Sequence, residues 1–394
     1  MLVLMAGVLS IASTGIFRRL DAAPGRTMRR DVTLDGLRSF LALAVVFNHM
    51  SMRRAAGASG AVQLPTSHVY FYLGSLGVSI FFMITGYLFW GRLLDTSGRP
   101  GWLKLYTHRF FRIVPLYWFL MVAYFAIVFY RAGFNSPVPI TEAMGQAMKW
   151  LAFGAYPYPP RFLGDARSML VVGMTWTLFF EWVFYASLLA LSVMAKTRWS
   201  GVIVVSALIL TLYASSGLAG QTVYYVAFFL CGMTAASVAR QLPQWHGDGI
   251  IRSSIALCLL IGAIALSPTA YSLAGVCLLG LFFLLIASGT SIFGLLLTRG
   301  AVRLGHASYS LYLLHGLTLS LIFAPSVLGT YAMSSPLHFW IVAALTMVVL
   351  ASVAAISYLL IEKRGIAIGH KLLARTQPVA LELGRTDSAT KAPQ

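Results

Sequence analysis

The sequence has 394 residues, of which 59% are hydrophobic and only 10% are charged, and its mean hydropathy is +0.80. A soluble domain needs more charge than this to cover its surface, so the composition excludes that class and predicts an integral membrane protein. The apolar runs are continuous rather than alternating, which favours an all-α, polytopic helix bundle.

Ten apolar runs are long enough to cross the hydrocarbon core of a bilayer, which is roughly 30 Å thick and requires about 20 helical residues. They predict about ten transmembrane helices in one membrane domain. We expect these helices at residues 34–52, 69–90, 112–131, 168–194, 200–217, 221–239, 251–267, 270–288, 306–328 and 338–361.

A further apolar stretch at residues 1–17 precedes the ten runs and is followed by Arg18 and Arg19. It lacks the leading charges and the small-residue cleavage site of a signal peptide. Two interpretations stay open: translation starts at Met28, so that residues 1–27 are not translated, or the stretch is an extra apolar helix. The expected domains are an N-terminal extension at 1–30, a membrane domain at 31–365 and a polar cytoplasmic tail at 366–394.

The net charge of +18 could suggest a nucleic-acid partner, but the positions of the basic residues argue against one. If the first span starts in the cytoplasm, six of the 29 Lys and Arg residues lie on the outer side and the other 23 lie at or near the cytoplasmic side. This is the positive-inside asymmetry, so both ends of the ten-helix unit are predicted to be cytoplasmic. The six outer residues are Arg53, Arg54, Arg131, Lys149, Arg161 and Arg167.

The first expected span carries polar groups near both of its ends. Arg38 and His49 are eleven residues apart, so they project from one helix face within about 20° and lie roughly 16 Å apart along the axis. Asp35 shares that face, and Asn48 precedes His49. An arginine that extends to the interface and a structural histidine are the alternatives, but the shared face favours a functional stripe that points into the bundle.

Glu181 is the acidic residue that lies deep inside an apolar run, where an ionisable group costs at least about 2.5–3.5 kcal/mol. Thr177, Glu181 and Tyr185 follow i, i+4, i+8 spacing and form one polar stripe. We expect Glu181 near mid-membrane, at a depth comparable with that of His49, which allows a histidine–carboxylate pair. The alternative is a structural glutamate that bonds to a neighbouring helix.

Two other groups of polar residues occur at helix boundaries. Arg109 and Arg112 share a face before the third span, and clustered guanidinium groups suit phosphates, although flanking charges of the positive-inside kind are the alternative. Gly86 in the second span is expected to allow close helix packing. The ninth span opens with Ser308, Tyr312 and His315 on one face.

Motifs for common cofactors do not occur in the sequence. There is no CxxC, HExxH, P-loop or GxSxG arrangement, and no metal is expected. Cys231, Cys258 and Cys277 lie inside expected spans without metal-ligand spacing, so they are interpreted as small core residues.

Five motifs together resemble one family. They are LDGLR followed ten residues after its arginine by a histidine, GVSIFFMITGYL, RFFRIVPLYW, TWTLFFEWVFY and SYSLYLLH. They occur in the order seen in the acyltransferase-three family of integral membrane acyltransferases, and the resemblance covers residues 33 to about 364.

This resemblance implies an activity and a location. The expected enzyme is a membrane O-acyltransferase that moves an acyl group, commonly acetyl, from cytoplasmic acyl-CoA to a hydroxyl of a cell-surface or exported glycan. Its implied partners are the acyl-CoA, a glycan or glycolipid acceptor such as a lipopolysaccharide or another polysaccharide, and the lipid bilayer of a bacterial inner membrane. Acetyl-CoA would be a co-substrate, with no permanently bound cofactor.

The resemblance also implies residue roles. Arg38 and His49 match the Arg-x10-His pair of the family, Arg109 and Arg112 match its basic motif, and Glu181 matches its acidic residue. We therefore expect His49 and Glu181 to be catalytic, with Glu181 orienting the imidazole, and the three arginines to bind the donor. The expected supporting residues are Asp35, Asn48, Trp176, Thr177, Tyr185, Ser308, Tyr312 and His315.

The sequence departs from the family pattern at two positions of the fourth span. Thr177 stands where serine is usual, and Trp182 stands where a second acidic residue is common, which puts the acceptor in doubt. The alternative function is a proton-coupled transporter or flippase for an anionic or glycan substrate, in which His49 and Glu181 relay protons. Internal repeats and broken mid-membrane helices in both halves would favour the transporter, and neither is evident.

Overall fold

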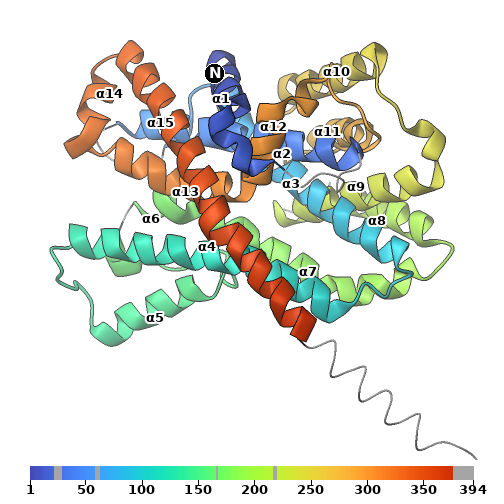
Figure 1. Cartoon of the computed structure of the whole chain (residues 1–394), viewed down its shortest axis with the longest axis horizontal. Helices are drawn as coiled ribbons and strands as arrows, with labels where there is room; N and C mark the ends of the chain where they lie inside the picture. Colours follow the sequence, from blue (N-terminus) through green and yellow to red (C-terminus); the bar gives the residue numbers. More distant parts are fainter. Residues whose placement is uncertain (22–28, 58–62, 166, 216–219, 376–394) are drawn as a thin grey trace, which may run out of the picture.

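The computed structural model describes residues 1–21, 29–57, 63–165, 167–215 and 220–375, and within these ranges the chain is all-α (Figure 1). The expected start at Met28 and residues 376–394 of the expected tail lie outside the described residues, while residues 366–375 continue the last helix. The α-helices are α1 Leu2–Ser13, α2 Arg29–Ala56, α3 His68–Asp95, α4 Trp102–Arg131, α5 Ile140–Leu151, α6 Ser168–Val172, α7 Trp176–Ala195, α8 Ser200–Ser215, α9 Thr222–Gln241, α10 Ile250–Leu266, α11 Leu273–Ala287, α12 Arg299–His306, α13 Ser308–Ile322, α14 Thr330–Ser334 and α15 Pro336–Ser357.

Five helical segments of the described chain are long and apolar enough to cross a membrane, or six if one bent pair counts as a single span. The bent pair joins α13 to the segment 325–334 at an angle of 57°, and Pro325 lies at the break. The protein is therefore a multi-pass membrane protein by its helix composition. The five segments are His68–Asp95, Trp102–Arg131, Leu170–Ala195, Thr222–Gln241 and Pro336–Arg375.

The other expected spans correspond to helices that do not meet these criteria. In the described chain, α8, α10 and α11 are apolar but have 16, 17 and 15 residues. The 28-residue helix α2 is long enough, but its polar residues lower its mean hydropathy. The number of ten spans thus stays a prediction, whereas the polytopic helical architecture is confirmed.

Charged contacts show which helix ends lie on the same side of the bundle. Asp95 at the end of α3 accepts hydrogen bonds of 2.6 and 2.7 Å from Arg240 at the end of α9. Arg53 at the end of α2 lies close to Arg131 at the end of α4 and to Arg167. These groupings agree with the expected alternation of helix directions; which side faces the cytoplasm stays a prediction.

Small residues let α3 pack tightly along α9. A Cβ atom at Gly86 would overlap the backbone carbonyl of Phe229, and one at Gly232 would overlap that of Met83. Close approach of two backbones is typical of membrane helices. Lipid tails are as apolar as the side chains, so the hydrophobic effect does not drive helices together and van der Waals packing at small residues does. The packing role that the sequence predicts for Gly86 is confirmed.

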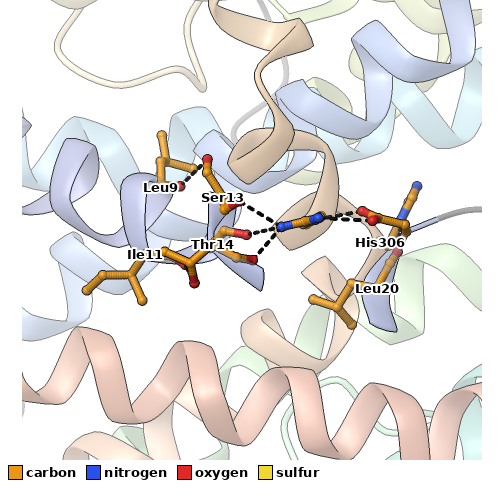
Figure 2. Close-up of polar contacts among 9 residues, drawn as sticks. Leu9, Ile11, Ser13, Thr14, Leu20 and His306 are labelled. Atoms are coloured by element: carbon orange, nitrogen blue, oxygen red, sulfur yellow. Dashed lines mark hydrogen bonds and ion pairs between the residues drawn. The ribbon is translucent and has the colours of Figure 1, made fainter. Parts of the chain in front are cut away.

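The N-terminal segment 1–21 packs against α12, and Figure 2 shows the polar contacts that join them. The guanidinium of Arg303 donates to the carbonyls at the C-terminal end of α1, those of Ala12, Ser13 and Thr14, at 3.1, 2.9 and 2.7 Å. It also forms a two-pronged ion pair with Asp21, at 2.6 and 2.9 Å. Arg303 therefore caps the C-terminal end of α1, where backbone carbonyls have no partner inside the helix.

The three cysteines were expected to be core residues, and this is correct only in part. Cys231 is buried between helices, but Cys258 and Cys277 are exposed on the surface of the bundle. Two of the three cysteines are therefore not core residues. In a membrane protein an apolar surface faces lipid, so a small, weakly polar side chain is tolerated there as well as in the core.

Candidate active site

Three expected arginines line one cavity between α2, α3, α4, α7 and α13. This cavity, here called the arginine cavity, has a volume of about 100 Å³. Its polar lining gathers residues that the sequence predicts from four separate motifs, so the polar stripes of these helices do face one another. The expected site residues that line it are Arg38, Arg109, Arg112, Thr177, Glu181, Tyr185, Ser308 and Tyr312.

Arg38 is held at the cavity by a polar chain that starts at the N-terminal segment. Its Nη1 donates to Asp35 Oδ1 at 2.7 Å, the contact expected for residues three apart on one helix face. The other carboxylate oxygen of Asp35 lies 3.5 Å from Nε2 of His306, whose Nδ1 donates to the carbonyl of Leu20 at 2.8 Å. Both ring nitrogens of His306 thus face acceptors, which suits the imidazolium form.

Glu181 lies within the arginine cavity rather than against a histidine. Its Oε2 accepts a hydrogen bond of 3.0 Å from Tyr185, one helical turn along α7. The guanidinium groups of Arg109, Arg112 and Arg38 lie close enough to attract its charge. Glu181 therefore balances part of the positive charge of the cavity, while the side chain of Arg109 rests over the ring of Phe89 at 4.3 Å.

Glu362 is a buried acidic residue that the sequence did not single out. Its side chain has no exposed surface; Oε1 accepts from Arg112 Nε at 3.3 Å, and Oε2 accepts from Ser310 at 3.2 Å. A carboxylate at the end of an apolar run, and not only one deep inside a run, is therefore buried in the bundle. The signal in the sequence was present, because Glu362 follows an apolar run directly, but Lys363 and Arg364 make it look like an interfacial charge.

His49 lines a second cavity of about 270 Å³, here called the histidine cavity, together with Asn48 and Trp176. Nδ1 of His49 lies 3.0 Å from the carbonyl oxygen of Val45, which can only accept, so Nδ1 carries the proton. Nε2 is then left with a lone pair that can accept a proton. Asn48 donates to the carbonyls of Tyr70 and Phe71 at 2.9 and 3.3 Å, which fixes this turn of α2 against α3.

His315 packs against His49 from α13. The two ring centroids are 4.7 Å apart in an edge-on arrangement, and Nδ1 of His315 donates to the carbonyl of Tyr312. His315 is completely buried, and within the described chain its Nε2 has no hydrogen-bond partner. His315 therefore lies next to His49, whereas Ser308 and Tyr312, which were expected on the same face of α13, line the arginine cavity.

Tyr312 and Val78 separate the two cavities, because both residues line both of them. The hydroxyl of Tyr312 is held at 3.2 Å from both Thr177 Oγ1 and the carbonyl of Met174. His49 and Glu181 consequently lie on opposite sides of this partition, and no contact between them is present in the described chain. The expected direct pair of these two residues stays a prediction without a structural contact to support it.

The fold and the two cavities define a multi-pass helical membrane protein with a buried ionisable site. Over residues 31–356 the chain matches a family model described as an acyltransferase domain. The protein therefore belongs to the acyltransferase-three family of integral membrane acyltransferases, and it is an acyltransferase, as the resemblance of its motifs predicts. No curated protein and no solved structure matches the chain at a significant level.

Proposed function

We propose that the protein is an O-acyltransferase that moves an acetyl group from cytoplasmic acetyl-CoA to a hydroxyl of a cell-surface or exported glycan in a bacterial inner membrane. The observation that carries this proposal is the pair of adjoining cavities, one lined by three arginines and the other by a histidine with an available lone pair. An acyl thioester is already activated, so the protein has to bind the donor, align the acceptor and remove one proton.

The arginine cavity is the proposed donor site. Guanidinium groups bind phosphates with paired hydrogen bonds, and Arg38, Arg109 and Arg112 line one cavity. A volume of about 100 Å³ is below the range of small-molecule pockets, so the acyl-thioester end of the donor would enter and the nucleotide would stay at the mouth. Glu181 would offset the mutual repulsion of the arginines when no donor is bound.

The histidine cavity is the proposed acceptor site, with His49 as the general base. Nε2 of His49 would take the proton of the acceptor hydroxyl as its oxygen attacks the thioester carbon. The new C–O bond would form as the C–S bond breaks, and the imidazolium would return its proton to the CoA thiolate. The products are the acyl ester and CoA with a free thiol, and the thioester end must pass Val78 and Tyr312 to reach the base.

The test is acyl transfer from labelled acetyl-CoA in membranes that contain the wild-type protein or the His49→Ala variant. Removal of a general base costs typically 10²–10⁴-fold, so we expect about a hundredfold loss of turnover or more. The matched control is His338→Ala, because His338 packs on Tyr331 and lines neither cavity. Wild-type turnover in the His49→Ala variant would contradict the proposal.

The same membranes separate this function from transport. A transporter would move its substrate across the bilayer with no covalent change, whereas the proposed enzyme gives a labelled ester and one free thiol for each acyl group transferred. Net movement of an unmodified anion or glycan, driven by a proton gradient and lost in the His49→Ala variant, would favour the transporter.

A further inference from the structure

Three of the side chains that line the histidine cavity rest on one buried aromatic residue, Tyr225. The ring of Tyr225 lies 5.2 Å from that of Trp176 and 5.2 Å from that of Tyr271, measured between centroids. Its hydroxyl donates to Oε1 of Gln221 at 3.0 Å. Because Tyr225 is 4% exposed, it fixes these lining residues from behind without entering the cavity.

Tyr225 is itself held rigidly by its neighbours. Its ring packs edge-on against Phe82 and Phe180, with centroid distances of 5.8 and 4.7 Å. Edge-to-face aromatic pairs of this kind each add about 0.5–1.5 kcal/mol beyond the burial of their surface. The wall formed by Trp176, Tyr271 and Gln221 is therefore organised before any ligand arrives, which reduces the entropy cost of binding.

Two polar side chains of this wall have donor groups that can form hydrogen bonds to a ligand. Oε1 of Gln221 is used by Tyr225, and within the described residues the two donors of its amide nitrogen have no other partner and can bond to a ligand. Thr269 Oγ1 accepts from the backbone N–H of Tyr271 at 3.1 Å, and its hydroxyl proton has no acceptor among the described residues, so it can donate to a ligand. Aromatic faces beside hydroxyl and amide donors match a sugar ring, which has apolar C–H faces and a rim of oxygen atoms.

The size of the cavity and the absence of charge in its described lining restrict the class of ligand that it can bind. About 270 Å³ is at the lower limit of small-molecule pockets, which is enough for one sugar residue rather than an oligosaccharide. Within the described chain its lining contains no aspartate, glutamate, lysine or arginine. A carboxylate or phosphate would lose its hydration there without gaining a counter-charge, so an acidic sugar is disfavoured.

We propose that the histidine cavity binds a single uncharged pyranose residue of the acceptor, which stacks on Trp176 and Tyr271 and accepts hydrogen bonds from Gln221 and Thr269. In this pose one sugar hydroxyl lies towards Nε2 of His49. The inference rests on the proposed function for its biological meaning, because it names the substrate class of the acceptor site. The binding itself can be measured without any acyl transfer.

The experiment measures binding of methyl α-D-glucopyranoside to the purified full-length protein in lipid nanodiscs, by saturation-transfer NMR in the absence of acetyl-CoA. The acidic probe is the corresponding methyl glucuronide. We expect the wild-type protein to bind the glucoside at least about tenfold more tightly than the glucuronide. Truncation of an aromatic anchor typically costs more than 1 kcal/mol, so Trp176→Ala should weaken glucoside binding about tenfold.

Two other variants and one control keep the test independent of folding. Tyr271→Phe retains the ring and should bind as the wild type does, whereas Gln221→Ala removes two donors from an exposed helix start and should weaken binding several-fold. Trp199→Ala is the matched control, because Trp199 is 57% exposed and lines neither cavity. A melting curve of each variant reports whether it is folded.

The outcomes separate this inference from the proposed function. No glucoside binding by the wild-type protein, equal binding by the Trp176→Ala variant, or tighter binding of the glucuronide would each overturn the sugar site, even if labelled acetate still reached a membrane acceptor. Specific glucoside binding with no acetyl transfer from acetyl-CoA would retain the sugar site and contradict the transferase assignment.

Discussion

Glu362 and Arg112 illustrate what a buried charge requires from this bundle. Glu362 is completely buried, and its partner comes from a helix 250 residues earlier in the chain. Burial of an isolated carboxylate in such a place would cost several kcal/mol. The ion pair with Arg112 and the hydrogen bond from Ser310 offset this desolvation cost of Glu362. The same arrangement fixes Arg112 at the arginine cavity, because one of its nitrogens is committed to Glu362.

We predict that Glu362→Ala lowers the free energy of unfolding by about 3 kcal/mol, since removal of the buried carboxylate leaves the guanidinium of Arg112 without its ion-pair partner. The measurement is thermal or denaturant unfolding of the detergent-solubilised protein. Asp95→Ala is the matched control, because Asp95 pairs with Arg240 but its side chain is 58% exposed, and exposed pairs contribute about 1 kcal/mol or less. Equal losses in the two variants would contradict this reasoning.

The contrast between Glu181 and Glu362 shows how far the sequence can predict the site. Helix spacing places Thr177, Glu181 and Tyr185 on one face, and all three line the arginine cavity. Spacing gives no information on which face of α2 meets which face of α7, so the expected contact between His49 and Glu181 could not be tested from the sequence. Glu362 was missed because its partner Arg112 is close only in the folded chain.

The N-terminal segment is the element whose role the sequence left most open. Its two interpretations were an untranslated stretch and an extra helix, and the structure gives residues 2–13 a helix with specific partners on α12. Gly300 lies so close to this helix that a Cβ atom would overlap the carbonyl of Leu9. Where translation starts stays a prediction, and N-terminal sequencing of the membrane-bound protein would decide it.

The ion pair between Asp21 and Arg303 predicts a pH-dependent stability. The hydrogen bonds from Arg303 lower the pKa of Asp21 below its ordinary value of 3.8. A carboxyl with a lowered pKa in the folded state adds stability that is complete above 3.8 and is lost as the pH falls through the folded-state pKa. Melting of the wild type and of Asp21→Asn should therefore differ at neutral pH and converge in acid.

Arg303→Ala should be more destabilising than Asp21→Asn, because it also leaves the carbonyls of Ala12, Ser13 and Thr14 without their donor. The control is Arg299→Ala on the same helix, where the side chain is exposed and a small effect is expected. If all three variants melt at the same temperature, the N-terminal segment does not contribute to the stability of the bundle.

Helix boundaries were less predictable than helix identity. Every expected span overlaps a helix, but α8, α10 and α11 are shorter than the approximately 20 residues that a span requires. Local residues set several of these boundaries: Ser267 and Pro268 end α10 within one residue of the expected end at 267, and Ser335 starts α15 by accepting a hydrogen bond from the backbone of His338. Hydropathy locates each span but not the residue that caps it, so α11 begins at Leu273, after the Ser272 cap, rather than at the expected residue 270.

At the scale of the whole molecule, the two cavities lie on the two sides of one partition formed by Val78 and Tyr312. If the arginine cavity opens to the cytoplasm, as the positive-inside asymmetry predicts, donor and acceptor approach from opposite sides of the bilayer. In liposomes with the protein in one orientation, acetyl-CoA should then support transfer from one side only, and a membrane-impermeant acceptor from the other.

The partition itself can be tested with Val78→Trp, which places a larger side chain between the two cavities. We expect acyl transfer to fall at least about tenfold while binding of acetyl-CoA is retained, because the arginines are not altered and the obstruction affects only the acyl end. Retained binding also shows that the variant is folded. Val122→Trp is the control, since Val122 is 63% exposed on α4 and lines neither cavity. Wild-type transfer by Val78→Trp would mean that the thioester reaches the acceptor by another route, and His49 would then lose its place in the reaction.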